Sequence, residues 1–227
     1  LADDAADARA VVRVLRPLAD EVVVVAADGE HPAVHEQDGV WAAVVPVHQD
    51  ADGTRHAPDY RVRARYGHES TTVDDPYRFL PTLGDVDLHL IREGRHEELW
   101  RALGANVRTY PSALGDTTGT AFAVWAPNAR AVRVIGDFNG WGPTHPMRSL
   151  GSPGVWALFV PGVVAGARYK YEILGPDGSW RQKADPLAKA AEVPPATASV
   201  VFESLYDWSD YEWLAERAAH DPHTKPL

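Results

Sequence analysis

The sequence contains no cysteine and no long apolar segment. Without cysteine the protein has neither a disulfide framework nor thiolate chemistry. No apolar run approaches the ~18 residues that a membrane-spanning helix needs. The amino terminus also lacks the pattern of a signal peptide. We therefore expect a globular protein of the cytoplasm.

Positive charge is scarce as well. The chain has 22 lysines and arginines against 32 acidic residues, which gives a net charge of −10. Nucleic acids and anionic membranes attract basic surfaces, so this balance argues against both as partners. It says nothing against uncharged partners such as sugars. The sequence has no phosphate-binding glycine loop followed by Lys-Ser/Thr and no Gly-x-Ser-x-Gly, and we expect no cofactor.

Most of the chain consists of short runs rich in β-branched and aromatic residues, separated by turn residues. The run at 60–66 alternates residue by residue, which is typical of a strand with one buried and one exposed face. Residues 85–103 differ, because their apolar side chains recur at roughly helical spacing. Gly94 interrupts this segment and Gly104 is placed to end it, so we predict two short helices between two β units.

The two β units repeat each other at an offset of about 110 residues. Five segments recur in the same order, and several are nearly identical, as with Gly-Val-Trp-Ala at 39–42 and at 154–157. The other matched pairs are 15–22 with 125–132, 45–46 with 160–161, 60–62 with 169–171, and 75–77 with 185–187. Agreement in order and spacing at five places indicates a duplicated unit.

Each unit has several short strands at regular spacing, which is typical of an antiparallel β-sandwich of roughly 100 residues. The predicted fold is therefore mainly β, with two tandem immunoglobulin-like antiparallel β-sandwiches joined by a short helical linker. The predicted boundaries are 1–80 for the first sandwich, 81–115 for the linker, 116–205 for the second sandwich, and 206–227 for a short helix and exit linker. Ser209 and Glu212 form a capping box that predicts this last helix, ending at about Ala219.

The repeats differ in their aromatic residues. Residues 136–141 read Gly-Asp-Phe-Asn-Gly-Trp, whereas the first repeat has Ala-Ala-Asp-Gly-Glu-His at 26–31. Trp180 follows a hairpin turn, and its counterpart is Ser70. Exposed aromatic faces stack on the apolar face of a sugar ring, while amides, hydroxyls and ammonium groups bind its hydroxyl rim. Trp141 and Trp180 are therefore candidate sugar platforms, with Lys170, Asn139 and Thr197 as candidate hydrogen-bonding partners.

The competing interpretation is that the tryptophans belong to the core. We favour this interpretation for Trp41 and Trp156, which occupy matched places within strands, and for Trp125. Trp141 and Trp180 both follow turn residues and are missing from the first repeat, so we expect them to be exposed. Phe138 is expected to close the edge of the core rather than to meet a ligand.

Segments of the second repeat resemble the family 48 carbohydrate-binding module, in the form found in glycogen branching enzymes. The segments that carry this resemblance are Trp-Ala-Pro-Asn-Ala at 125–129, Gly-Asp-Phe-Asn-Gly-Trp at 136–141, Tyr-Lys-Tyr-Glu at 169–172 and Lys-Ala-Asp-Pro at 183–186. It continues into the first repeat through 74–79 and 99–104. Bacterial branching enzymes with a long amino-terminal extension have two such sandwiches before the catalytic barrel.

The resemblance implies that Trp141, Lys170 and Trp180 contact α-1,4-linked glucose chains, with Thr197 and Ser199 nearby. It implies a non-catalytic region that binds glycogen or maltooligosaccharides and adjoins the catalytic barrel of the same polypeptide. Such a barrel needs about 250 residues of its own, so we expect no catalytic site in this chain. The adjacent carboxylates at 74–75 and 97–98 are expected to be solvated or to cap turns.

Two histidine pairs have metal-like spacing, His31 with His35 and His220 with His223. Neither pair has a third ligand nearby, so we expect exposed histidines and no metal site.

Two alternatives to a glucan-binding region of a branching enzyme remain. In the first, both sandwiches are a scaffold that packs on the catalytic barrel and sets the preferred chain length without binding sugar. In the second, the chain is a glycogen-targeting module of a debranching enzyme or of a kinase regulatory subunit. The doubled sandwich counts against the second alternative.

Overall fold

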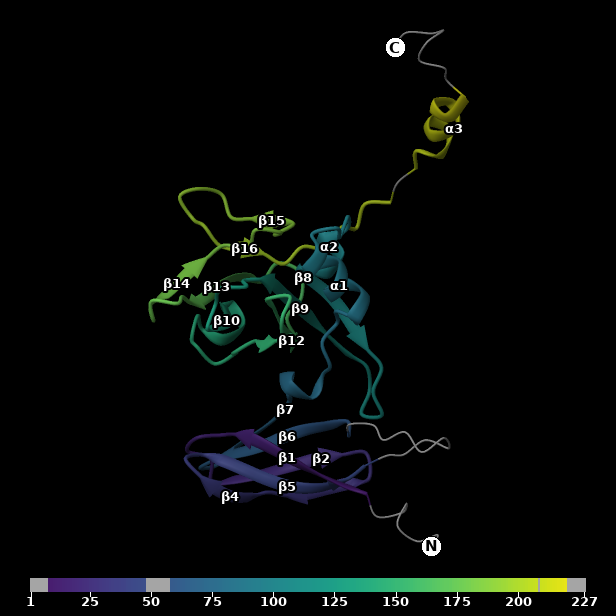
Figure 1. Cartoon of the computed structure of the whole chain (residues 1–227). Helices are drawn as coiled ribbons and strands as arrows, with labels where there is room; N and C mark the ends of the chain where they lie inside the picture. Colours follow the sequence, from purple (N-terminus) through teal and green to yellow (C-terminus); the bar gives the residue numbers. More distant parts are fainter. Residues whose placement is uncertain (1–7, 48–57, 208, 220–227) are drawn as a thin grey trace, which may run out of the picture.

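The computed structural model describes residues 8–47, 58–207 and 209–219, which form two β-sandwiches in tandem (Figure 1). The first sandwich has seven strands: β1 (Arg9–Leu15), β2 (Glu21–Ala26), β3 (Gly29–Pro32), β4 (Val34–Gln37), β5 (Val40–Pro46), β6 (Tyr60–Tyr66) and β7 (Glu69–Asp74). They form one sheet in the order β1-β5-β4 and a second in the order β3-β2-β6-β7, with antiparallel pairing throughout. The predicted antiparallel sandwich is confirmed.

Three short helical elements connect the sandwiches: η1 (Pro76–Arg78), α1 (Asp85–Glu93) and α2 (Leu99–Ala102). The turn between α1 and α2 begins at Gly94, whose left-handed backbone (φ 67°) ends α1, as the sequence predicted. The linker is shorter than predicted, however. Residues 104–110 are a strand and not part of a helical connection.

The second sandwich begins with that strand. Its strands are β8 (Gly104–Tyr110), β9 (Thr117–Trp125), β10 (Ala131–Gly136), β11 (Arg148–Ser149), β12 (Val155–Pro161), β13 (Arg168–Leu174), β14 (Trp180–Lys183), β15 (Ala190–Ala191) and β16 (Ser199–Val200). One sheet runs β11-β12-β9-β8 and the other runs β10-β13-β16-β15, with β14 paired to β13. The second sandwich therefore begins before the predicted boundary at 116. The sequence of β8 has no strong alternation of apolar and polar residues, and the strand is defined by its pairing with β9.

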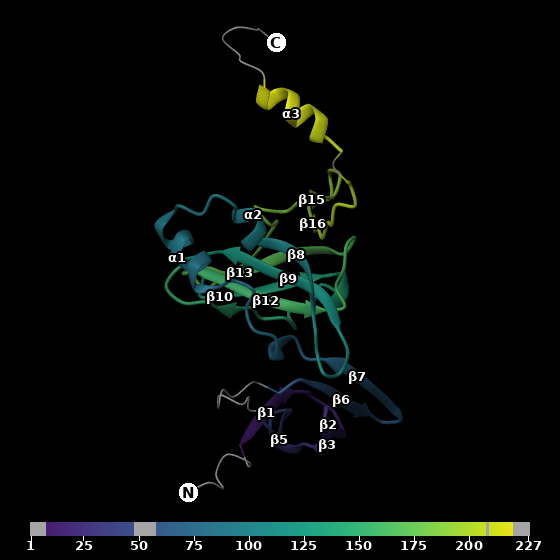
Figure 2. The same ribbon diagram turned by 90° about the vertical axis from the view of Figure 1, so that its right-hand side faces the viewer.

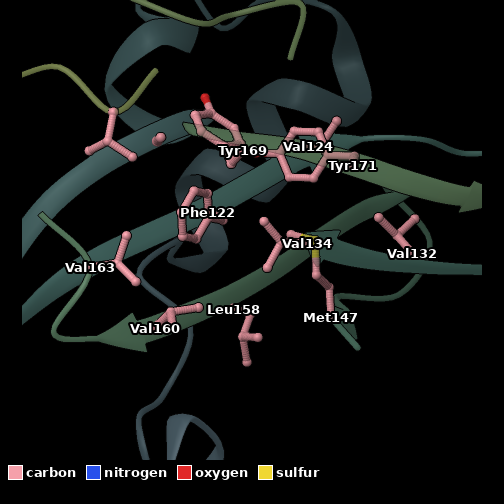
Figure 3. Packing of buried hydrophobic residues seen from close by; sticks show 12 residues of the cluster. Phe122, Val124, Val132, Val134, Met147, Leu158, Val160, Val163, Tyr169 and Tyr171 are labelled. Carbon is pink, nitrogen blue, oxygen red and sulfur yellow. The ribbon is translucent and has the colours of Figure 1, made fainter. Parts of the chain in front are cut away.

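The core of the second sandwich lies between its two sheets (Figure 3). Phe122 and Tyr169 meet edge to face at 4.9 Å between ring centroids, a favourable geometry for aromatic pairs. Phe138 packs against this cluster from its edge, as predicted. Valines dominate the smaller core of the first sandwich.

Both sandwiches contain the same buried tyrosine–aspartate bond. Tyr60 Oη donates to Asp75 Oδ2 at 2.9 Å in the first, and Tyr169 Oη donates to Asp185 Oδ2 at 2.6 Å in the second. Each aspartate precedes a proline and also accepts a backbone N–H two residues further on. The duplication predicted from sequence is therefore present in the hydrogen bonds, and Asp75 caps a turn as expected.

The matched Gly-Val-Trp-Ala segments are explained by a close backbone approach. A Cβ on Gly39 would lie 2.7 Å from Cα of Pro17, and one on Gly154 would lie 2.5 Å from Cα of Pro127. Both glycines also have positive φ angles, 80° and 75°. No other residue fits these positions without moving the neighbouring turn.

The two sandwiches meet around η1. The guanidinium of Arg148, in the second sandwich, donates to the carbonyls of Tyr77 and Phe79. Tyr77 in turn donates its hydroxyl to the carbonyl of Pro146 at 2.8 Å. Figures 1 and 2 both show η1 between the two sandwiches. These bonds attach η1, which follows the last strand of the first sandwich, to the second sandwich.

The last helix, α3 (Tyr211–Ala219), ends where the capping box predicted. It lies apart from both sandwiches in Figures 1 and 2. The predicted exit linker at 220–227, with His220 and His223, lies outside the described residues. Within the part of the chain that the structure describes, no helix is long and apolar enough to cross a membrane.

The buried tyrosines predict a loss of stability at alkaline pH. Burial, with the nearby carboxylate of Asp75 or Asp185, raises the pKa of Tyr60 and of Tyr169 well above the ordinary value of about 10. The two neutral hydroxyls therefore stabilise the folded state fully below pH ~10, and this stabilisation is lost as the pH rises above that value. Each should lower the free energy of unfolding by about 1.4 kcal/mol per pH unit in this range.

Denaturant unfolding at a series of pH values above 9 measures this slope. Tyr169→Phe should make it shallower, because phenylalanine does not ionise. Tyr211→Phe is the matched control, since Tyr211 is exposed on α3. Equal slopes for Tyr169→Phe and the parent chain would contradict the prediction.

Candidate functional site

The loop after β10 is held in shape by the side chain of Asn139. Its Oδ1 accepts the backbone N–H of Gly136 at 2.9 Å, and its Nδ2 donates to the carbonyl of Val134 at 3.1 Å. The short helix η2 (Asp137–Asn139) then leads into two left-handed residues, Gly140 (φ 58°) and Trp141 (φ 59°). Both polar atoms of the Asn139 side chain therefore bond to the backbone of the loop. Asn139 would influence a ligand by positioning Trp141.

Asp137 ties this loop to strand β13. Its carboxylate accepts the guanidinium of Arg168 through two bonds, at 2.9 and 3.0 Å, and also the backbone N–H of Arg168. The indole Nε1 of Trp141 donates to the same carboxylate at 3.3 Å. Hydrogen bonds from Arg168 lower the pKa of Asp137, so this link is present at neutral pH.

Strand β13 carries the polar part of the site. Its residues alternate, so Tyr169 and Tyr171 point into the core while Lys170 points out with Arg168 and Glu172. The ammonium of Lys170 donates to Thr197 Oγ1 at 2.7 Å. The two groups are thus close enough to contact the same ligand. The tertiary structure therefore brings these two predicted residues together.

Trp180 lies on the same outward face. It pairs with Leu174 at the far end of β13, and paired residues of a sheet point to the same side. The guanidinium of Arg133 lies 4.0 Å from the centre of its ring, and Arg133 is also bonded to Glu172 at 2.5 Å. This cation–π contact fixes one face of the indole.

The two candidate tryptophans are both half-exposed, at 38% for Trp141 and 42% for Trp180. They lie toward opposite ends of β13, and Lys170 lies between them. The outward face of this sheet thus offers two aromatic rings with an ammonium and a hydroxyl between them. Such a surface is suited to a flat, hydroxyl-rich ligand.

Ser199 does not lie on this face. The register pairs it with Tyr169, whose ring is in the core, and its side chain is only 1% exposed. Its hydroxyl accepts the backbone N–H of Asp185 at 2.9 Å. The role implied for Ser199 is therefore corrected: it supports the buried aspartate, because the strand alternation turns it inward.

The sequence interpretation of Trp125 was also wrong. Trp125 is 57% exposed, and its Nε1 donates to the carbonyl of Pro153 at 2.9 Å. Val124 before it fills the core, so alternation along β9 sends Trp125 to the opposite side of its sheet. Trp41 and Trp156 pack against the two cores, as predicted.

Three charged residues of the site were missed from sequence: Arg133, Asp137 and Arg168. The available signal was the alternation of charges along β13, at Arg168, Lys170 and Glu172, together with the single charge of β10, Arg133. That signal becomes specific only when the register between the strands is known, because each charge is paired with a residue on a neighbouring element.

Among its described residues, 8–47 and 58–74, the first sandwich has no such face. Its strand β6 presents three arginines outward, and each one pairs with an acidic residue of a neighbouring strand. The pairs are Arg61 with Asp74, Arg63 with Glu30, and Arg65 with Glu21. This ladder of ion pairs occupies the positions that correspond to Lys170 and its neighbours.

Over residues 8–47, 58–207 and 209–219, no group of three or more histidine, cysteine, aspartate or glutamate side chains is arranged to hold a metal ion. His31 contacts Asp28 at 3.1 Å.

Comparison with known proteins gives two family matches. Residues 3–77 match the N-terminal domain of alpha-1,4-glucan branching enzyme GlgB, and residues 102–188 match carbohydrate-binding module 48, the isoamylase N-terminal domain. The second match begins near β8, in agreement with the strand boundary in the structure. The fold and this match place the second sandwich in the carbohydrate-binding module 48 family.

Curated relatives match the chain over nearly its whole length. The 1,4-alpha-glucan branching enzyme GlgB of Thermobifida fusca (strain YX) is 62% identical over 221 residues, which is 95% of this chain and 28% of that protein. The GlgB of Rhodococcus jostii (strain RHA1) is 54% identical over 96% of this chain and 29% of its own length. The chain therefore corresponds to the amino-terminal region of GlgB, and it spans less than a third of these relatives.

Among solved structures, a pullulanase complexed with maltotetraose from Anoxybacillus sp. LM18-11 aligns with a TM-score of 0.39 at 19% identity. The alignment covers 88% of this chain and 26% of the pullulanase.

A pair of glycine substitutions tests how the loop holds Trp141. A Cβ on Gly136 would lie 2.3 Å from the carbonyl oxygen of Arg168, which is backbone and has little freedom to move. Gly136→Ala should therefore lower the free energy of unfolding by about 2–3 kcal/mol. A Cβ on Gly140 would meet no atom within 4 Å, so Gly140→Ala strains only the left-handed backbone. It should lower the free energy of unfolding by about 1 kcal/mol.

Denaturant unfolding compares the two variants directly. Equal costs, or a larger cost for Gly140→Ala, would show that the close approach between β10 and β13 does not constrain this loop.

Proposed function

We propose that this chain is the non-catalytic, α-glucan-binding and positioning region of a 1,4-alpha-glucan branching enzyme of the cytoplasm. The full-length enzyme would transfer α-1,4-linked segments to α-1,6 branch points in glycogen. The ligand would be an α-1,4-glucan chain such as glycogen or a maltooligosaccharide, and the intramolecular partner would be the catalytic barrel that follows in the same polypeptide.

The observation that carries this proposal is the outward face of β13. Trp141 and Trp180 expose their rings at its two ends, and Lys170 with Thr197 lies between them. Stacking on a ring desolvates the apolar face of a sugar, at roughly 25 cal/mol per Å² of buried apolar area. Because a glucan repeats the same unit, one chain would meet both rings at once.

Electrostatics also favour a neutral ligand at this face. Two arginines at this face are paired with carboxylates, Arg168 with Asp137 and Arg133 with Glu172. Their charges are thus balanced within the protein. Lys170 remains as a hydrogen-bond donor, since its ammonium contacts a hydroxyl and not a carboxylate. This arrangement supports binding of hydroxyl groups over binding of phosphates.

The scaffold alternative is supported by different surfaces. Helix α3 exposes three large apolar side chains, Tyr211, Trp213 and Leu214. An apolar pocket of about 360 Å³ lies between the linker helices and β9, with Trp125 on its wall. In this alternative these surfaces pack on the catalytic barrel, and the region sets chain length by shape.

Single tryptophan substitutions separate the two functions. Trp141→Ala and Trp180→Ala should each weaken binding of maltoheptaose about tenfold, because each removes one stacking platform. Trp125→Ala is the matched control, since Trp125 is as exposed but belongs to the other sheet. Titration calorimetry with maltoheptaose and retention on glycogen resin measure the effect.

Failure of the unaltered chain to bind maltoheptaose or glycogen would reject the glucan-binding function and leave the scaffold. Equal weakening by all three substitutions would show that the face on β13 is not the binding site.

A further inference from the structure

A second, chemically different groove lies at the end of the second sandwich, from which the chain runs toward α3. Here α2, β8, β15 and the segment after β16 come together (Figures 1 and 2). The groove has a volume of about 610 Å³ and is lined by Arg101, Asn106, Arg108, Lys189, Phe202 and Glu203, among others. It shares no lining residue with the face on β13.

Its charge is opposite to that of the protein. The whole chain carries a net charge of −10, yet this groove gathers Arg101, Arg108 and Lys189 around one carboxylate, Glu203. Arg101 is paired with Glu98, which lies outside the lining, at 3.4 Å. Within the described ranges, no carboxylate lies within ion-pair distance of Arg108 or Lys189.

The two cations without carboxylates are held near each other by neutral groups. The ammonium of Lys189 donates to Asn106 Oδ1 at 2.7 Å, and the amide of buried Asn106 is fixed by its own bond to the carbonyl of Leu103. Partial desolvation and the neighbouring guanidinium of Arg108 lower the pKa of Lys189, and the carboxylate of Glu203 acts in the opposite direction. Like charges held together in this way repel, and an anion between them would relieve the repulsion.

We propose that this groove binds a phosphate monoester. Arg108 and Lys189, which lack paired carboxylates, match the charge of a phosphate dianion better than that of a single carboxylate. Phe202 is 46% exposed beside them and offers an apolar surface to the group that carries the phosphate. A free hexose phosphate and a phosphate ester on a glucan share this chemistry.

The experiment titrates the chain at low ionic strength with three probes: inorganic phosphate, glucose 6-phosphate and glucose. Inorganic phosphate and glucose 6-phosphate should bind, and glucose should not bind at this groove. Tighter binding of glucose 6-phosphate than of inorganic phosphate assigns the ligand to a sugar phosphate. Equal binding assigns the site to the phosphate group itself.

The variants make the test specific. Arg108→Gln with Lys189→Gln should weaken binding of inorganic phosphate at least about tenfold, because two charge-assisted bonds are lost. Glu203→Gln should tighten it a few-fold, since it removes the one repelling carboxylate of the groove. The matched control is Arg92→Gln with Arg95→Gln, which removes two exposed cations near the end of α1, outside the groove.

Trp141→Ala separates this proposal from glucan binding, because it should leave phosphate binding unchanged. No binding of phosphate or glucose 6-phosphate by the unaltered chain would overturn the proposal. So would equal weakening by the Arg108/Lys189 and Arg92/Arg95 double variants. Thermal unfolding of each variant establishes that it is folded before binding is compared.

Discussion

The antiparallel pairing of β10 with β13 is the constraint on which the rest of the second sandwich depends. It sets Val134 opposite Tyr171 on the core side and Ile135 opposite Lys170 on the outward side. One strand therefore supplies both the aromatic core and the polar part of the site. A slip of one residue would exchange the two faces, placing an ammonium in the core and a tyrosine ring in water. Core packing and site geometry are thus enforced by the same hydrogen-bond ladder.

Duplication of the sandwich kept the buried contacts and left the outer face free to change. The tyrosine–aspartate bond and the glycine–proline contact occur in both copies, because a packed interior tolerates few alternatives. The outward faces have no such requirement. One carries a ladder of arginine ion pairs and the other carries Trp141 and Trp180. Exposed ion pairs of this kind contribute little to stability, so exchanging them for a binding surface costs the fold little.

The two candidate surfaces of the second sandwich differ in whether their basic side chains are paired with carboxylates. Around Trp180 and Trp141, each arginine is neutralised by a carboxylate, which leaves stacking and hydrogen bonding as the available interactions. In the groove near Phe202, Arg108 and Lys189 are held by an amide and a carbonyl instead. The same residue types therefore serve different ligand chemistries, according to whether an acidic partner lies within reach. Net charge, which is a sum over the whole chain, does not report this difference.

The sequence by itself determined the two sandwiches, the helices of the linker, the family, and the exposure of Trp141 and Trp180. These follow from local patterns: alternation in 60–66, the repeat, and turn residues before each tryptophan. Tertiary structure alone decided the position of β8, the inward direction of Ser199 and the outward direction of Trp125. It also decided that Arg133 would lie under Trp180. The physical reason is that each of these depends on strand register, which joins residues distant in sequence and is fixed only when the sheets pack.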